Sequence, residues 1–166
     1  LDALASVMKN IGETLPAAPM KALRSLLWNR LKLKFRGRKW KERTEIDIHP
    51  TEKRRLDIYN VIALSMAPVD VIRGADFQVR GLLLALSLGD TKQIGPAMAR
   101  EATFVASQGG RSLEKAKMWS RAANEIAKNI NDPYCKAWGQ GADAFVSFFS
   151  GAFHCTAPQF ERAANM

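Results

Sequence analysis

The sequence predicts an all-α fold built as a stack of antiparallel helix hairpins. Apolar residues recur at the three- and four-residue spacing of one helical face, and this pattern dominates from residue 51 onward. The helical segments are about 16–20 residues long and their connections are very short, which forces neighbouring helices to run antiparallel. No convincing pair of strands is visible. Repetition near about 40 residues per helix pair favours an open stack over a closed bundle.

The N-terminal part departs from this regular pattern. Residues 1–19 contain one glycine and two prolines and are expected to be an irregular lead-in. Residues 20–50 are expected to form a basic helix followed by a charged connection. One face of this helix is apolar and comprises Met20, Leu23, Leu27 and Leu31. Residues 31–35 also alternate between apolar and basic side chains, so a strand is the alternative there. Gly37 is expected to end the helix.

Start and stop signals delimit the remaining helices, which we expect over residues 51–166. Residues typical of N-caps or first helical turns mark the starts, namely Thr51, Asp70, Ser112 and Asp132 with Pro133. Proline or glycine marks the ends, at Pro68, Gly89, Gly109 with Gly110, and Gly151. A final helix is expected to begin near Pro158 and to continue to Met166.

The net charge of +9 is concentrated near the N-terminus. Ten of the 25 basic residues and one of the 16 acidic residues lie between Lys21 and Arg43, so the rest of the chain carries 15 of each and is neutral. This distribution favours a local electrostatic contact over a basic surface that covers the whole protein. The residues expected to make that contact are Lys32, Lys34, Arg36, Arg38, Lys39 and Lys41.

The partner of this basic segment is the main open question. Trp28 and Phe35 are seven residues apart, which indicates an apolar stripe on the same helix more than a platform for stacking bases. We therefore favour an acidic neighbour within the parent protein. An anionic membrane surface is the first alternative, because an amphipathic basic helix can lie in such an interface. Nucleic acid is the second alternative.

Four charged residues share one expected helix: Asp70, Arg73, Asp76 and Arg80. Spacings of three and four place Asp70 near Arg73 and Asp76 near Arg80. We expect ion pairs on the helix surface or between helices. Since Arg80 lies among apolar neighbours, a partly buried pair that fixes the packing of the helices is the alternative.

No catalytic, cofactor-binding or metal-binding motif is visible. The chain has neither of the common glycine-rich phosphate loops, and no Ser/His/Asp or Cys/His set in a motif context. Cys135 and Cys155 are expected to be reduced thiols near helix ends, and His49 and His154 to lie in loops. We therefore expect a non-catalytic segment without a cofactor. No apolar run approaches the ~20 residues of a membrane-spanning helix, and no signal peptide is visible.

The C-terminal part resembles a tetratricopeptide repeat. The residues that carry the resemblance are Gly151, Phe153, Thr156, Phe160 and Ala163, with Ala144 one helix earlier. In that family a glycine ends the first helix, an aromatic residue follows, and small residues let the second helix approach closely. The resemblance implies a tetratricopeptide-like α–α superhelix over residues 51–166, truncated at its C-terminus. Phe145 is expected in the core, unless it and neighbouring phenylalanines face a further repeat.

A longer stretch resembles a region of large bacterial serine/threonine protein kinases. It comprises residues 66–80, the run from Leu82 to Gly89, and the Ala-Arg-Glu-Ala of residues 99–102. In those proteins a kinase domain precedes an AAA-like ATPase and then helical repeats. The resemblance implies a non-catalytic, cytoplasmic signalling segment that scaffolds or regulates the kinase and ATPase modules. The implied partners are other domains of the same parent chain or a protein ligand.

Overall fold

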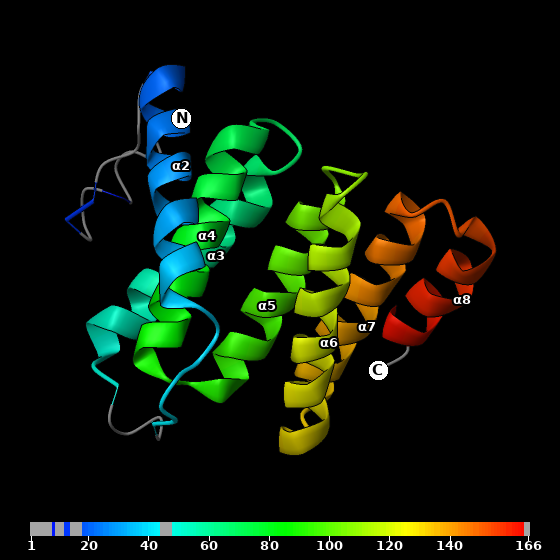
Figure 1. Ribbon diagram of the computed structural model, residues 1–166. Helices are drawn as coiled ribbons and strands as arrows, with labels where there is room; N and C mark the ends of the chain where they lie inside the picture. Colours follow the sequence, from blue (N-terminus) through cyan, green and yellow to red (C-terminus); the bar gives the residue numbers. More distant parts are fainter. Residues whose placement is uncertain (1–7, 9–11, 14–17, 44–47, 165–166) are drawn as a thin grey trace. The chain divides into compact units, whose positions relative to one another are not determined.

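The computed structural model describes residue 8 and residues 12–13, 18–43 and 48–164 (Figure 1). Regular secondary structure over these residues is entirely helical, which confirms the all-α class. The described helices are α2 (Pro19–Arg36), α3 (Pro50–Met66), α4 (Val71–Leu88), α5 (Thr91–Ala106), α6 (Ser112–Ile130), α7 (Pro133–Phe149) and α8 (Phe153–Ala164). The chain divides into two compact units, residues 1–88 and residues 89–166.

The helix α2 continues through residues 31–35, so the strand alternative for that stretch is wrong. A helix satisfies its backbone hydrogen bonds within the segment, which a single strand cannot do. Gly37 ends α2 as predicted. Its φ of 70° lies in the left-handed region that favours glycine, and its N–H donates to the carbonyl of Leu33.

Side-chain caps start α3 and α4. The imidazole of His49 accepts the N–H of Thr51 at 3.3 Å, so the cap lies two residues before the predicted start. The helix α3 ends before Pro68, as expected. Asp70 Oδ1 accepts the N–H of Arg73 at 3.0 Å, which confirms Asp70 as the cap of α4.

The starts of α5 and α7 also rest on aspartate caps. Asp90 accepts the N–H of Lys92 at 3.0 Å, and Asp132 accepts the N–H of Cys135 at 2.9 Å. The second of these caps confirms the predicted helix start at Asp132. Both carboxylates satisfy an amide that the first helical turn would otherwise leave without a partner.

The start of α6 agrees with the prediction to within one residue, whereas the start of α8 does not. Ser112 is the first residue of α6, and Arg111 occupies the capping position expected for Ser112. The helix α8 begins at Phe153, directly after the turn at Gly151, and not near Pro158. Pro158 lies inside α8, where it lacks an N–H to donate but does not end the helix. Proline favours the first turn of a helix, so the start is expected near Pro158, but the turn at Gly151 sets it at Phe153.

The first unit has its core between α3 and α4, with α2 packed on α4. The core cluster comprises Met8, Tyr59, Ile62, Ala63 and Phe77, and Met8 and Phe77 are completely buried. The helix α2 buries Ala22, Asn29 and Leu33. The domain boundary predicted at residue 50 therefore falls within this unit, because α2 packs against α4.

The apolar face predicted for α2 does not form its buried face. Met20, Leu27 and Leu31 are exposed by 66%, 60% and 41%. The buried face instead contains the polar residue Asn29, which is 8% exposed. This reversal leaves large apolar side chains on the outer surface of α2, where α3 and α4 do not cover them.

The second unit is formed by α5 to α8, in which α5 contacts both α6 and α7. Small residues permit these close contacts: a Cβ atom on Gly95 would lie 3.1 Å from Ile126 Cγ2. The core includes Ile94, Met98, Ala102, Trp119, Ala123, Ile126 and Ala142. Phe145 is 38% exposed, so the prediction that it lies in the core is wrong. The helix α7 buries its smaller side chains, such as Ala144 and Val146, in its place.

Candidate functional site

A groove of about 860 Å³ lies beside α2 in the first unit. Its apolar lining comprises Trp28, Leu31 and Phe35 of α2 and Leu83 and Leu84 of α4. Its charged lining comprises the cations Lys32, Arg36, Arg55 and Arg80 and the carboxylate Glu13. The groove therefore combines apolar surface with an excess of positive charge, which suits an acidic ligand that also carries apolar groups.

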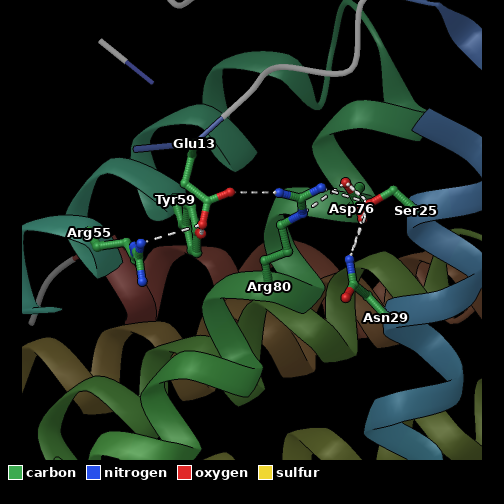
Figure 2. Close-up of polar contacts among 7 residues, drawn as sticks. All are labelled: Glu13, Ser25, Asn29, Arg55, Tyr59, Asp76 and Arg80. Carbon is green, nitrogen blue, oxygen red and sulfur yellow. Dashed lines mark hydrogen bonds and ion pairs between the residues drawn. The ribbon is translucent and has the colours of Figure 1, made fainter. Parts of the chain in front are cut away.

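A polar network joins α2 to α4 (Figure 2), and its members Ser25, Asn29 and Arg80 line this groove. Asp76 is completely buried at its centre. Asn29 Nδ2 donates to Asp76 Oδ1 at 2.8 Å, and the Ser25 hydroxyl lies 2.9 Å from Asp76 Oδ2. Arg80 Nε lies 3.0 Å from Asp76 Oδ2 in an ion pair, although the N–H is not aligned for a hydrogen bond. The buried carboxylate is thus surrounded by donors, as a charge removed from water requires.

Glu13 extends the same network toward α3 (Figure 2). The Tyr59 hydroxyl donates to Glu13 Oε1 at 2.7 Å. Arg55 lies 3.6 Å from Oε1, and Arg80 lies 3.4 Å from Oε2. Burial, followed by the hydrogen bond to Glu13, raises the pKa of Tyr59 to about 12. The tyrosine is therefore a neutral hydrogen-bond donor at physiological pH.

Both predicted ion pairs are present, but they differ in their surroundings. Arg73 pairs with Asp70 at the start of α4. The backbone N–H of Arg73 is the main cause that lowers the pKa of Asp70, and the guanidinium of Arg73 adds to it. Asp76 and Arg80 form the partly buried alternative, since their side chains are 1% and 19% exposed. The second pair lies at the contact between helices, whereas the first caps a single helix.

The predicted interaction residues of the basic segment separate into two groups. Lys32 and Arg36 line the groove. Lys32 Nζ lies 5.6 Å above the ring of Trp28, and the Arg36 guanidinium donates to the carbonyl of Leu86 at 2.8 Å. The remaining exposed cations, which do not line the groove, are Lys34, Arg38, Lys39 and Lys41. Arg36 is therefore partly a structural residue that binds the C-terminal end of α4.

Sequence reasoning missed several residues of the network: Glu13, Ser25, Asn29, Arg55 and Tyr59. One signal was visible, since Ser25 and Asn29 are four residues apart and so lie on the same face of α2. Glu13 carried no signal, because its partners lie 42 or more residues away in sequence. Long-range pairing of this kind follows from tertiary packing alone.

A second, smaller groove of about 420 Å³ lies in the second unit and is polar. Its lining includes Asn124, whose amide donates to Asp143 Oδ2 at 3.0 Å. Ser120 also donates to Asp143. On α7 and α8, exposed phenylalanines form edge-to-face contacts, in the pairs Phe145–Phe160, Phe148–Phe149 and Phe148–Phe153. None of these phenylalanines lines the polar groove.

Within the described residues, no three or more His, Cys, Asp or Glu side chains come together in a group that could hold a metal ion. Both cysteines are free thiols, as predicted; Cys135 is buried and Cys155 is exposed. Burial raises the pKa of Cys135 to about 12, and the nearby Asp132 carboxylate adds to the effect. His49 caps α3, but His154 lies in α8 and not in a loop, because α8 starts earlier than expected.

Comparisons with known protein families, with curated proteins and with solved structures give no match for this chain. Among the described helices, none has the length and apolar character needed to cross a membrane.

Proposed function

We propose that this chain is a non-catalytic helical scaffold that binds an acidic, apolar segment of a protein along the groove beside α2. One observation carries the proposal: α2 presents its large apolar side chains outward, beside lysine and arginine. Trp28 is 59% and Phe35 is 81% exposed. Contiguous exposed apolar surface of this kind marks interaction sites in soluble proteins.

The charge of the groove selects the chemistry of the ligand. Lys32 and Arg36 lie beside the apolar lining on α2. A protein segment with carboxylates beside apolar side chains would bury the apolar surface and pair with these cations. Such complementarity favours the protein partner over a nucleic acid, whose recognition also requires side chains placed for bases.

We further propose that the helices from residue 51 onward form a tetratricopeptide-like stack of hairpins. In support, α5 contacts both its hairpin partner α6 and the first helix of the next pair, α7. The exposed phenylalanines of α7 and α8, including Phe148 and Phe153, provide a surface on which a further hairpin could pack. Solenoid repeats bury such faces by stacking.

The proposed parent is a bacterial serine/threonine protein kinase, on the resemblance of residues 66–80, 82–89 and 99–102. In that context the ligand of the groove would be another domain of the same chain, and the segment would regulate the kinase and ATPase modules in signalling. The complete open reading frame tests this part directly. Absence of kinase and ATPase motifs in the flanking sequence would exclude it.

An anionic membrane surface is the second candidate partner. The observation that favours it is the position of Trp28 and Phe35 on an exposed face beside Lys32 and Lys34, since aromatic and basic residues together are typical of helices that lie in a lipid interface. Binding of this kind would depend strongly on the fraction of anionic lipid and on salt.

The test compares two probes on the full chain at physiological salt. One probe is a synthetic amphipathic helix with leucine on one face and glutamate on the other, and the second is a vesicle containing phosphatidylserine. The variant is Lys32→Glu with Lys34→Glu, since both side chains are exposed and Arg36 is needed to bind Leu86. The matched control is Lys115→Glu with Lys128→Glu on the exposed surface of α6.

We expect the peptide to bind, and the α2 variant to weaken its binding at least tenfold while the control variant does not. Peptide binding that both double variants reduce equally would show only nonspecific charge attraction and would contradict the proposal. Vesicle binding that the α2 variant alone abolishes, without peptide binding, would instead establish the membrane as the partner.

A further inference from the structure

Two residues upstream of α2, Met8 and Glu13, contact α3 and α4 in the first unit. Met8 is completely buried in the cluster with Tyr59 and Phe77. Five residues later, the carboxylate of Glu13 contacts two arginines and one tyrosine hydroxyl (Figure 2). Met8 therefore contributes an apolar side chain, and Glu13 a negative charge, to a surface formed by α3 and α4.

The backbone turns at Gly12, immediately before Glu13. Gly12 has a φ of 71°, which favours glycine, and the Glu13 N–H donates to the Met8 carbonyl at 2.9 Å. This backbone hydrogen bond brings the main chain of Glu13 next to that of Met8. A local backbone contact therefore joins the buried apolar residue to the residue that carries the carboxylate.

The partners of the Glu13 carboxylate are arranged as a receptor for an anion. Arg55 and Tyr59 come from α3, Arg80 comes from α4, and all three line the groove. Arg80 is itself held by Asp76, and its Nη2 donates to the Ser25 hydroxyl at 2.7 Å. The ring of Phe77 lies 5.1 Å from the Arg80 guanidinium carbon. The guanidinium is therefore positioned by contacts that do not involve Glu13.

We propose that Arg55, Tyr59 and Arg80 form a carboxylate-binding site for a short acidic peptide, and that Glu13 of the same chain, together with the buried Met8, occupies this site as an intramolecular ligand. The peptide class is an apolar residue followed, five positions later, by a glutamate. The inference rests on the proposed function, because it names a ligand class and a specificity site for the same groove. It adds a subsite that the α2 surface alone does not define.

An intramolecular ligand competes strongly with a free one. Tethering by a short linker gives an effective concentration on the order of millimolar, so a free peptide binds the unmodified chain only weakly. The apparent affinity for the free peptide rises in proportion to the fraction of chains whose own segment has left the site. Weakening the Glu13 contact should therefore raise the affinity for a peptide that retains the glutamate.

The experiment uses the full chain and a fluorescent peptide with the sequence of residues 4–16, and measures binding by anisotropy. The Glu13→Gln chain should bind this peptide at least tenfold more tightly than the unmodified chain. On the Glu13→Gln chain, a peptide with glutamine in place of the glutamate should bind at least tenfold more weakly. Equal binding of the two peptides, or equal affinity of the two chains, would overturn the inference.

A second pair of variants distinguishes binding at the carboxylate-binding site from nonspecific charge attraction. In the Glu13→Gln chain, Arg55→Gln should abolish peptide binding, whereas Arg54→Gln should leave it unchanged, because Arg54 is exposed and does not line the groove. Circular dichroism of each chain checks that the helices remain folded. The two proposals can fail separately. Loss of amphipathic-peptide binding in the Lys32→Glu, Lys34→Glu chain would support the proposed function. If the chains with changes at residues 13 and 55 nevertheless bind the two residue 4–16 peptides with equal affinity, this inference fails while the proposed function stands.

Discussion

Asn29 of α2 donates a hydrogen bond to Asp76 of α4, with 2.8 Å between Nδ2 and Oδ1. This contact links two helices whose residues are 47 positions apart in sequence. It also fixes which face of α2 is buried, because Asn29 and Ser25 both point toward the carboxylate (Figure 2). The outward position of Trp28 and Phe35, on which the proposed function depends, follows from this polar contact as much as from apolar packing.

Replacing Asp76 should therefore destabilise the first unit strongly. Asp76→Ala removes the partner of Asn29 and leaves Arg80 without its buried carboxylate, which should lower the free energy of unfolding by about 3–5 kcal/mol. Asp70→Ala is the control and should cost about 1 kcal/mol, since it removes only a helix cap and a more exposed pair. Urea unfolding followed by circular dichroism measures both values. Equal losses would contradict a central role for Asp76.

The ionisation of Tyr59 should report the network in solution. The pKa of Tyr59 is raised from its ordinary value of 10.0 to about 12, chiefly by burial, so the folded chain keeps the phenolic proton over a range in which the unfolded chain loses it. Between about pH 10 and pH 12 the folded state binds more protons, and its stability falls as the pH rises. Below pH 10 this contribution is fully present.

Tyrosinate absorbance in a Tyr134→Phe background measures the titration of Tyr59 directly. The stability difference between this chain and its Tyr59→Phe derivative should shrink as the pH rises through the same window. A midpoint near the ordinary value of 10.0 would show that the hydroxyl is not buried against Glu13 in solution.

The two thiols should differ sharply in reactivity. Cys135 is buried, its thiol donates to the Lys92 carbonyl at 3.4 Å, and its pKa is raised to about 12. Since the thiolate is the reactive form, Cys135 should not react with a thiol reagent at neutral pH, whereas the exposed Cys155 should. Titration should find one thiol in the folded chain and two after denaturation. A folded Cys155→Ser chain that still reacts rapidly would contradict the burial of Cys135.

Two glycines in α7 should respond in opposite ways to alanine. A Cβ atom on Gly139 would lie 2.5 Å from Asn124 Oδ1, and hydrogen bonds hold that amide in place. Gly139→Ala should therefore destabilise the second unit by about 1–3 kcal/mol. Gly141→Ala meets no atom within 4 Å and should stabilise the helix by about 0.5–1 kcal/mol. Thermal unfolding gives both signs, and a neutral Gly139→Ala would show that α6 and α7 are further apart.

Two phenylalanines test the difference between core and surface packing. Phe77 is completely buried, and Phe77→Ala should cost about 3–5 kcal/mol of unfolding free energy. Phe145 is 38% exposed and touches Phe160 edge to face, so Phe145→Ala should cost only about 1–2 kcal/mol. A cost for Phe145 as large as that for Phe77 would mean that other protein surface covers it in solution.

Helix boundaries were mostly predictable because their signals are local. Asp70, Asp132 and Gly37 act within one turn of their own positions, so the sequence around each residue contains the whole interaction. The boundary of α8 was missed for the converse reason. Pro158 carries a local signal for a helix start, yet α8 begins at Phe153 and packs on α7, so Pro158 lies inside the helix.

The sequence by itself determined the all-α class, most helix limits and the pairing of Asp76 with Arg80, since each depends on residues a few positions apart. It also located the positive charge in residues 21–43. Only the tertiary structure decided that the apolar face of α2 points outward and that Glu13 meets Arg55, Tyr59 and Arg80. These contacts join residues far apart in sequence, which helical periodicity cannot relate to one another. When either of two helix faces could be buried, the buried face is the one whose polar groups find partners on the neighbouring helix.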